Sequence, residues 1–455
     1  MKFVAEACGG ELLRGDADAT VTRVCTDSRQ VQPGDLFVAL AGDKFDGHDF
    51  LAEVAQKGVV AVVVDRAKAA SVPQGCAVIA VGHTRRALGQ VAARYRQDFA
   101  LPVVAVGGSN GKTTTKELLA AVLRGKFSTL ASEASFNNDI GVPLTLLKLE
   151  RAHGAAVFEV GTNHPGELAP LVRMVQPRLG VVTSIGREHL EFFRDVNGVA
   201  QEEGWLAALL PADGTLLVNG DSPAMDLVTR RANCRVVRAG FGERNDWRAT
   251  DARLDECGTT FSVTAPRSEF GGEHRLALLG RHQVTNALLA MAVGAELGVQ
   301  RDAVARALAE CKPPKLRMNV WTVGEARMLD DCYNANADSM LAALRTLREL
   351  PCSGRRMALL GDMAELGEQS AAAHAEVGRG AAESGVQVLF AVGKWAGVTA
   401  DAAKVAGLRD VRVFAEVADA ARAVKAELQA GDWLLLKASR SVQLERAAAV
   451  LKETT

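Results

Sequence analysis

Short apolar runs, many of them β-branched, recur along the chain and alternate with longer stretches of helical periodicity. The first two runs, at residues 35–40 and 59–64, enclose a helix-like stretch at 49–57. This alternation is typical of parallel strands joined by helices. The pattern predicts a first, small α/β domain over residues 1–83.

An amphipathic helix predicted at residues 84–98 leads into a second and longer alternation. Its predicted strands are apolar at nearly every position, as expected of strands buried on both faces of a sheet. A β-rich insertion at 248–279 and a long alanine-rich helix follow. We therefore predict a central domain over 84–312 with a doubly wound, P-loop-type parallel sheet that binds ligands at the carboxyl ends of its strands. The predicted strands are 103–106, 155–160, 179–184 and 214–219.

Two adjacent prolines, Pro313 and Pro314, mark the next boundary, because paired prolines end helices and stiffen linkers. Residues 313–455 alternate again, with a helix at 339–350. This third domain has a Rossmann-like α/β pattern but lacks the G-x-G-x-x-G fingerprint, so we do not expect it to bind a dinucleotide. Its predicted strands are 327–331, 357–360, 388–392 and 432–437.

Composition narrows the class of protein. The 455 residues are 48% hydrophobic and carry a net charge of -1, which gives no basic field for nucleic acid or an anionic membrane. No stretch approaches the roughly 20 apolar residues that span a bilayer, and Glu6 interrupts any secretory signal. The eight cysteines contain no C-x-x-C pair, so buried, reduced thiols are expected. We expect a cytoplasmic monomer without a nucleic-acid partner.

The strongest candidate site is the turn between the strand at 103–106 and a helix at 114–123. Its glycines allow backbone N–H groups to converge on one anion, and the helix start adds its positive dipole end. Lys112 supplies a charge for the terminal phosphates, and Thr113 a hydroxyl for Mg²⁺. The long phosphate-loop signature requires glycine where this chain has Val106, so the loop is the compact form G-S-N-G-K-T. We predict nucleotide binding here.

Three other positions each admit two interpretations. Glu159 lies inside an apolar strand, where it is either salt-bridged or a ligand of Mg²⁺. His189 follows another strand and is either a capping or surface histidine or a functional one. The turn at residues 26–29 has either ordinary turn chemistry or a ligand-binding role.

Several separated motifs, taken together, resemble the Mur ligase family over the whole length of the chain. The strings N-N-D-I-G-V-P, Y-N-A-N and G-D-M-A-E-L-G are characteristic of one member of that family. The motifs lie at residues 108–113, 137–145, 159–167, 189–191, 282–286, 330–336, 361–367 and 437–440.

The resemblance implies a three-domain, ATP-dependent amide ligase that uses Mg²⁺. Its substrates would be UDP-N-acetylmuramoyl-tripeptide, held by the N-terminal domain, and D-alanyl-D-alanine, brought by a closing C-terminal domain. In the family reaction the tripeptide carboxylate attacks the γ-phosphate of ATP, and the amine then attacks the resulting acyl phosphate. Bringing two anions together requires positive charge, which Lys112 and Mg²⁺ would supply.

The same resemblance assigns roles by residue. The catalytic set is Lys112, Glu159, His189 and Glu203. Thr113 and Glu159 would bind a first Mg²⁺, and His189 a second. The nucleotide contacts are Gly108, Ser109, Asn110, Gly111, Lys112, Thr113, Thr114, His282, Asn286, Arg317 and Asp331. The substrate contacts are Thr26, Asp27, Ser28, Arg29, Asn137, Asn138, Thr162, Asn163, Tyr333, Asn334, Asn336, Lys437, Ser439 and Arg440.

Two departures from the family pattern affect these assignments. Glu203 stands where the family has a lysine that is carbamylated by CO₂. We expect Glu203 either to replace that carbamate, directly or through a water, or to be a solvated helix glutamate. Leu316 replaces the glycine before Arg317, and leucine disfavours a positive φ.

Two rival functions remain open at this point. One is a sister ligase that acts on another amino acid, on folate or on cyanophycin. The other is an ATPase whose hydrolysis drives motion or partner binding, which would leave the domain beginning near residue 313 without a role. The sequence does not distinguish diaminopimelate from lysine as the third residue of the tripeptide.

Overall fold

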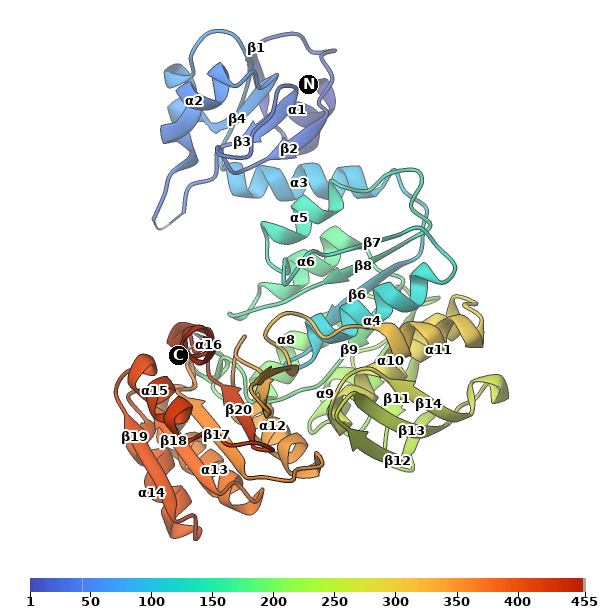
Figure 1. Ribbon diagram of the computed structural model, residues 1–455. Helices are drawn as coiled ribbons and strands as arrows, with labels where there is room; N and C mark the ends of the chain where they lie inside the picture. The colour runs from blue at the N-terminus through green and yellow to red at the C-terminus, as the bar shows by residue number, and fades with distance from the viewer. Residues whose placement is uncertain (43, 453–455) are drawn as a thin grey trace. The chain divides into compact units, whose positions relative to one another are not determined.

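The computed structural model describes residues 1–42 and 44–452 of the chain, which form two compact units (Figure 1). This division differs from the domain boundaries expected at residues 83 and 312, which stay a prediction. The first unit comprises Met1–Ala105, Ser128–Thr162 and Glu167–Arg178, and the second comprises Val106–Phe127, Asn163–Gly166 and Leu179–Thr455.

The first unit begins with a five-stranded sheet in the order β1-β5-β4-β3-β2, drawn in blue in Figure 1. Strands β2 to β5 are parallel, and β1 runs antiparallel to β5. Helices α1 and α3 cover one face of the sheet, where they pack against Leu36 and Val38. Helix α2 covers the other face, where it packs against Phe37 and Ala39. Both faces are buried, which explains the uninterrupted apolar runs of the sequence. The elements are α1 (Lys2–Cys8), β1 (Glu11–Arg14), β2 (Arg23–Cys25), β3 (Asp35–Val38), η1 (Gly47–Phe50), α2 (Leu51–Gln56), β4 (Ala61–Asp65), η2 (Arg66–Ser71), β5 (Ala77–Val81) and α3 (Thr84–Arg96).

A nine-stranded sheet follows, and strand β6 (Val103–Gly107) belongs to both units. The run β6-β8-β7 lies in the first unit, where α5 and α6 pack against α3. The run β14-β13-β12-β11-β10-β9-β6 lies in the second, where α4 packs against α10 and α11. The first unit contributes β7 (Thr129–Ala131), α5 (Gly141–Leu146), β8 (Ala155–Glu159) and α6 (Leu168–Val175).

The rest of that sheet and its helices lie in the second unit. The predicted β-rich insertion is the antiparallel run β12, β13 and β14, so this prediction is confirmed. The helix after the phosphate loop begins at Lys112, two residues earlier than predicted. The elements are α4 (Lys112–Arg124), β9 (Leu179–Val182), α7 (Leu190–Phe193), α8 (Val196–Ala208), β10 (Thr215–Asn219), α9 (Met225–Thr229), β11 (Arg235–Gly240), β12 (Trp247–Asp255), β13 (Gly258–Thr264), η3 (Ser268–Phe270), β14 (Gly272–Leu276), α10 (Arg281–Glu296) and α11 (Arg301–Glu310).

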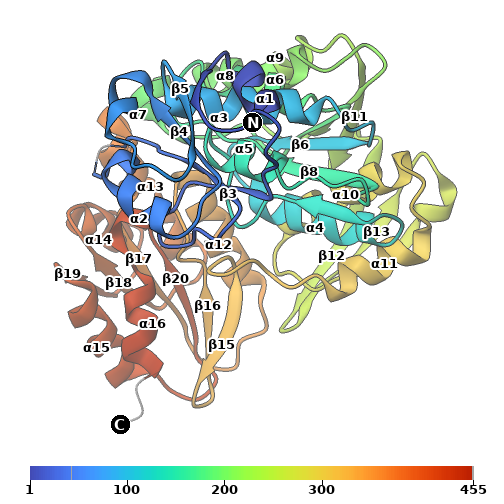
Figure 2. The same ribbon diagram turned by 90° about the horizontal axis from the view of Figure 1, so that it is seen from above.

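The second unit ends in a six-stranded sheet of order β15-β16-β20-β17-β18-β19, with only β15 antiparallel to its neighbour. Helices α12, α13 and α14 lie on one face, and α15 and α16 on the other (Figure 2). This is the arrangement that right-handed crossovers produce when the strand order reverses after β19. The elements are β15 (Asn319–Val323), β16 (Ala326–Asp330), α12 (Ala337–Glu349), β17 (Arg356–Gly361), η4 (Gly367–Gln369), α13 (Ser370–Glu383), β18 (Val388–Val392), α14 (Ala396–Val405), β19 (Asp410–Phe414), α15 (Val417–Glu427), β20 (Trp433–Lys437), η5 (Arg440–Val442) and α16 (Glu445–Lys452).

Within the described ranges, no helix is long and apolar enough to cross a membrane. All eight cysteines are free. Cys257 is exposed, which differs from the expected burial, whereas Cys8, Cys25, Cys76, Cys311 and Cys332 are buried as expected.

Candidate active site

The phosphate loop connects β6 to α4, and its two glycines with positive φ are sterically required. Gly108 has a φ of 109°, and a Cβ there would lie 2.6 Å from Thr183 Oγ1 and 2.8 Å from Ser184 O. Gly111 has a φ of 89°, and a Cβ there would lie 2.8 Å from Asn286 Oδ1. No other residue fits this backbone without displacing a neighbour, so the glycine argument made from sequence holds.

Lys112 folds back over the loop that it follows. Its Nζ donates to Gly108 O at 2.5 Å and to Ser109 O at 3.3 Å, and lies 3.4 Å from Glu188 Oε2. The two side chains are 14% and 8% exposed, so the pair is largely removed from water. A buried cation needs such compensation. The loop carbonyls and Glu188 therefore compensate the charge of the Lys112 amine, the role expected of phosphate oxygens when a nucleotide binds.

Glu203 reaches the same loop from α8. Its carboxylate is fully buried, and Oε2 accepts a hydrogen bond from Gly108 N at 2.7 Å. Burial raises the pKa of Glu203 to about 8, against a smaller opposing effect of Lys112. Oε1 is buried and makes no hydrogen bond within the described part of the chain. The alternative of a solvated helix glutamate is therefore wrong, because α8 turns this side chain into the protein and not toward solvent.

Glu159 ends strand β8 of the first unit, where Asn137 positions it. Glu159 is 1% exposed, and its Oε1 accepts a hydrogen bond from Asn137 Nδ2 at 2.9 Å. The Asn137 carbonyl in turn accepts from Gly161 N at 2.9 Å. Glu159 Oε2 is buried and has no hydrogen-bond partner among the residues that the structure describes. An orphaned carboxylate oxygen of this kind fits a cation.

The neighbouring predicted substrate contacts have mixed surroundings. Asn138 Oδ1 accepts from Gly141 N at 2.9 Å and so supports the start of α5. Thr162 is 6% exposed, whereas Asn163 is exposed. Their roles as substrate contacts stay predictions.

The turn at residues 26–29 closes on itself. The Arg29 guanidinium donates to both oxygens of Asp27 at 2.9 and 2.8 Å, and Arg29 N donates to Oδ1 at 3.0 Å. These bonds lower the pKa of Asp27 to about 2. Ser28 O accepts from Lys57 Nζ at 2.7 Å, and Thr26 precedes this pair. Ordinary turn chemistry accounts for the geometry, and the ligand-binding interpretation stays a prediction.

Of the two predicted nucleotide contacts on α10, Asn286 lies beside the loop. Asn286 is 5% exposed, lies behind Gly111, and donates from Nδ2 to Gln283 Oε1 at 2.8 Å. Burial lowers the pKa of His282 to about 4, so its imidazole is neutral. Gln283 thus fixes the orientation of Asn286.

Residues near 317 approach the phosphate loop within the second unit. Arg317 donates to Thr113 Oγ1 at 3.1 Å, and its guanidinium lies 4.1 Å from the centre of the Tyr333 ring. Leu316 has a φ of 60°, so a leucine adopts here the left-handed backbone that glycine accepts more readily. Met318 N donates to Asp331 Oδ1 at 3.3 Å and helps to hold this turn.

The remaining predicted residues of the C-terminal region converge on the loop at 330–336. Lys437 is 2% exposed and donates to Asp331 Oδ2 at 2.5 Å and to Asn334 O at 3.0 Å. Asn336 caps α12 and also donates to Asn110 Oδ1 at 3.0 Å, which joins this loop to the phosphate loop. The other contacts are Ser439 Oγ to Ala335 O and Arg440 N to Asn334 Oδ1.

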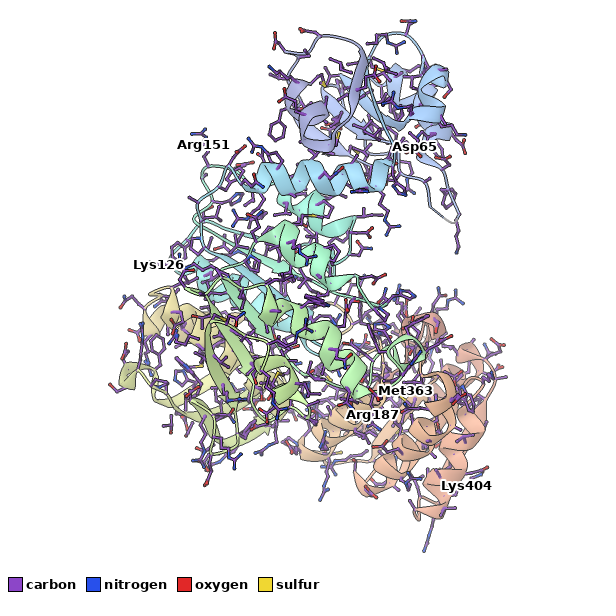
Figure 3. The ribbon with its side chains drawn as sticks, turned by 180° about the vertical axis from the view of Figure 1, so that it is seen from behind. Asp65, Lys126, Arg151, Arg187, Met363 and Lys404 are labelled. Carbon is purple, nitrogen blue, oxygen red and sulfur yellow. The ribbon has the colours of Figure 1, made fainter. Side chains whose placement is uncertain are left out.

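Sequence reasoning missed Arg187, Asp338, Glu365 and Glu376 in this region, and also Glu188 beside Lys112. Arg187, marked in Figure 3, donates from its backbone and guanidinium to Asp338 at 2.7 to 3.0 Å, and to Glu376 at 2.5 Å. These carboxylates raise its pKa above the ordinary value.

His189 Nδ1 lies 2.5 Å from Glu365 Oε2 and lowers the pKa of that carboxyl. Glu365 belonged to a recognised motif, but no spacing rule connects it to His189.

Across residues 1–42 and 44–452, no three His, Cys, Asp or Glu side chains gather as a ready metal cage. A nucleotide-bound Mg²⁺ needs few protein ligands, because phosphate oxygens and waters supply the others. The orphaned Oε2 of Glu159 is a group well suited to such an ion.

Comparisons with known proteins cover the whole chain. Sequence models match at residues 20–96 (Mur ligase family, catalytic domain), 106–294 (Mur ligase middle domain) and 316–440 (Mur ligase, glutamate ligase domain). The UDP-N-acetylmuramoyl-tripeptide–D-alanyl-D-alanine ligase of Bacillus subtilis is 34% identical, with 100% of this chain and 98% of that protein covered.

Solved structures give the same result. A crystal structure of MurF from Acinetobacter baumannii is 31% identical with a TM-score of 0.90, covering 99% of this chain and 98% of that one. The structure of MurF ligase from Thermotoga maritima in complex with ADP is 26% identical with a TM-score of 0.83, covering 95% and 98%. The three-domain α/β fold expected from the sequence is confirmed, and the chain belongs to the Mur ligase family.

Proposed function

We propose that this chain joins D-alanyl-D-alanine to UDP-N-acetylmuramoyl-tripeptide with the conversion of ATP to ADP and phosphate. The observation that carries the proposal is that residues near 317–336 reach the phosphate loop, through Arg317 to Thr113 and Asn336 to Asn110. The full-length relative in Bacillus subtilis, whose name states this pair of substrates, supports the same assignment.

The chemistry proceeds through an acyl phosphate. A tripeptide carboxylate oxygen attacks the γ-phosphorus, and the bond to the bridging oxygen breaks to release ADP. The dipeptide amine then attacks the acyl carbon, loses a proton, and expels phosphate to leave an amide. The loop N–H groups, Lys112 and Arg317 would stabilise charge on the transferring group. For this, Lys112 must exchange its bonds to Gly108 O and Ser109 O for phosphate oxygens.

We propose that Thr113 and Glu159 bind a first Mg²⁺ and that His189 binds a second. The orphaned Oε2 of Glu159 supports this assignment, because a buried carboxylate oxygen without a donor favours a cation. Bound Mg²⁺ would neutralise phosphate charge during transfer. Asn137, by donating to Oε1, would leave Oε2 of Glu159 for the metal.

The direct test uses the full chain with ATP, UDP-N-acetylmuramoyl-tripeptide and D-alanyl-D-alanine, with products read by mass. We expect the pentapeptide product in equal amount to the phosphate released. A diaminopimelate and a lysine tripeptide, tested in parallel, identify the third residue. Phosphate release that ignores the amine acceptor would favour the ATPase instead, and turnover with a single amino acid in place of the dipeptide would favour a sister ligase.

Glu203 is proposed to take the place of the carbamylated lysine of relatives. Its full burial beside the phosphate loop and its orphaned Oε1 support a role toward the reacting charge. A side chain that is already a carboxylic acid needs no CO₂, so activity in CO₂-stripped buffer should stay within about twofold of that with bicarbonate. Glu203→Lys is the matched variant, which should regain activity only when bicarbonate is added. Strong bicarbonate rescue of the unaltered enzyme would contradict the proposal.

The remaining predictions belong to the same proposal. We propose that the enzyme works in the cytoplasm, where ATP and the UDP-linked substrate are made, and that it acts as a monomer without nucleic acid. Size measurement with and without substrates tests the oligomeric state.

A further inference from the structure

His189 and Glu365 meet across two loops of the second unit, and both have an unusual backbone. His189 follows β9 with a φ of 49°, and Glu365 follows β17 with a φ of 60°. Residues other than glycine occupy this left-handed region uncommonly, at a cost of about 1–3 kcal/mol each, and such positions concentrate at functional sites. Two of them in direct contact show that the surrounding structure imposes this geometry.

The contact places a carboxylate on one particular nitrogen of the imidazole. Glu365 Oε2 lies 2.5 Å from His189 Nδ1, and the His189 side chain is 15% exposed. An ionised carboxylate can only accept, so Nδ1 carries the hydrogen and Nε2 of the neutral ring keeps its lone pair. Histidines that bind metals generally donate their other ring N–H to such an acceptor, and loss of that acceptor lowers metal affinity by about 10- to 100-fold.

The loop that carries Glu365 contacts the segment that carries His189 at several further points. Glu191 N donates to Glu365 O at 3.1 Å, and Gln369 Nε2 donates to Arg194 O at 3.1 Å. A Cβ on Gly367 would lie 3.3 Å from the Glu191 Cα, so the two backbones are in close approach there. The position of the Glu365 carboxylate therefore depends on this loop being docked.

We propose that Glu365 is a positioning residue that sets the tautomer and orientation of His189, so that Nε2 is ready to bind a metal when the loop at 361–367 is docked. The inference rests on the proposed function, in which His189 is a ligand of the second Mg²⁺. It adds that this ligand is completed by a residue of the following domain, 176 positions away in the chain.

Four variants of the full-length protein test the inference. Glu365→Gly removes the carboxylate while leaving a residue that accepts the left-handed backbone, and Glu365→Gln keeps an acceptor without the charge. His189→Gly removes the proposed ligand and likewise leaves a residue that accepts the left-handed backbone. Glu368→Gln changes an exposed carboxylate in the same segment and is the matched control.

The measurement is Mn²⁺ binding in the presence of ADP and inorganic phosphate, followed by electron paramagnetic resonance of free Mn²⁺, with circular dichroism to confirm folding. We expect Glu368→Gln to bind like the unaltered protein and His189→Gly to lose the weaker Mn²⁺ site. Glu365→Gly should weaken that site by about 10- to 100-fold, and Glu365→Gln by less.

The outcomes distinguish the positioning role of Glu365 from the proposed role of His189 as a metal ligand. If His189→Gly loses the weaker site but Glu365→Gly keeps it unchanged, the positioning role is overturned and the proposed metal ligand stands. If His189→Gly keeps the weaker site, the proposed ligand is wrong and the inference falls with it. A Glu365→Gln variant as weak as Glu365→Gly would place the effect in charge rather than in the hydrogen bond, which also contradicts a positioning role.

Discussion

The phosphate loop and the segment at residues 187–194, which includes α7, both follow a parallel strand, but they differ in how far along the chain their contacts reach. The phosphate loop is shaped by its own glycines and by Lys112, which donates to a carbonyl four residues earlier. In the second segment, Arg187 pairs with Asp338 and Glu376, which lie 151 and 189 residues later. The turn of the phosphate loop can thus be predicted from its own residues, although Glu203 and Asn336 also bond to it, whereas the geometry around His189 depends on tertiary contacts alone.

The largest expected effect comes from a substitution within the phosphate loop. Lys112→Met should lower phosphate release by at least about 10³-fold, because it removes one of the two cationic side chains that we propose to stabilise the transferring phosphoryl group. Product formation by mass is the measurement. Lys404→Met, at an exposed position on α14 marked in Figure 3, is the control and should leave activity unchanged. A Lys112 variant with a tenth of full activity would show that the loop is not the reacting site.

A steric comparison of two glycines sharpens the same point. Gly108→Ala should lower the free energy of unfolding by about 2–4 kcal/mol, from left-handed strain plus a clash with Thr183 and Ser184. Gly166 has a φ of 91° with nothing within 4 Å of a Cβ, so Gly166→Ala should show the strain alone, about 1–2 kcal/mol. Urea unfolding measures both, and equal losses would mean that the close packing of the loop is not required.

Glu203 gives a pH test of how a distant residue affects the loop. Its pKa of about 8 lies above the ordinary 4.5, so between these values the unfolded chain releases a proton that the folded chain keeps. Stability should therefore fall as the pH rises, by at most about 1.4 kcal/mol per pH unit, and level off above pH 8. Glu203→Gln should lack this part of the pH dependence, measured by urea unfolding from pH 5 to 9. Parallel curves for the variant and the unaltered protein would contradict the raised pKa.

The smallest expected effect comes from a change in the tertiary contacts around His189. Arg187→Gln removes charge-assisted hydrogen bonds to Asp338 and Glu376 and should lower kcat/KM for the dipeptide about 10-fold, while ADP affinity changes less than twofold. A double-mutant cycle with Glu376→Gln should give a coupling of about 0.5–1 kcal/mol, since these side chains are 27% and 36% exposed. Strict additivity would mean that this ion pair does not help to seat α13.

The sequence predicted well wherever the signal was local. Strands buried on both faces were visible as apolar runs, and the compact phosphate loop could be read from its glycines, Lys112 and the flanking strand and helix. Short edge strands such as β1, β2 and β15 were missed, because partly exposed residues give no clear period there.

The candidate site was predictable only as far as motifs name residues. Glu203 shows the limit, because its helix position admitted a solvated or a buried side chain, and only the fold of α8 decided between them. Glu188, Arg187 and Glu365 acquire their roles from partners 76 to 189 residues away, and neither periodicity nor spacing encodes such pairs. Leu316 shows that a leucine can hold a left-handed backbone beside a turn that a tertiary hydrogen bond from Met318 N to Asp331 helps to hold.

Isotope transfer tests most directly the central claim, that the phosphate loop serves to activate a carboxylate. The terminal carboxylate of UDP-N-acetylmuramoyl-tripeptide is labelled with ¹⁸O, and the phosphate released during turnover with ATP and D-alanyl-D-alanine is analysed by mass. An acyl-phosphate route breaks the bond between the acyl carbon and the carboxylate oxygen, so each phosphate should carry one ¹⁸O. Unlabelled phosphate alongside the amide product would contradict the account.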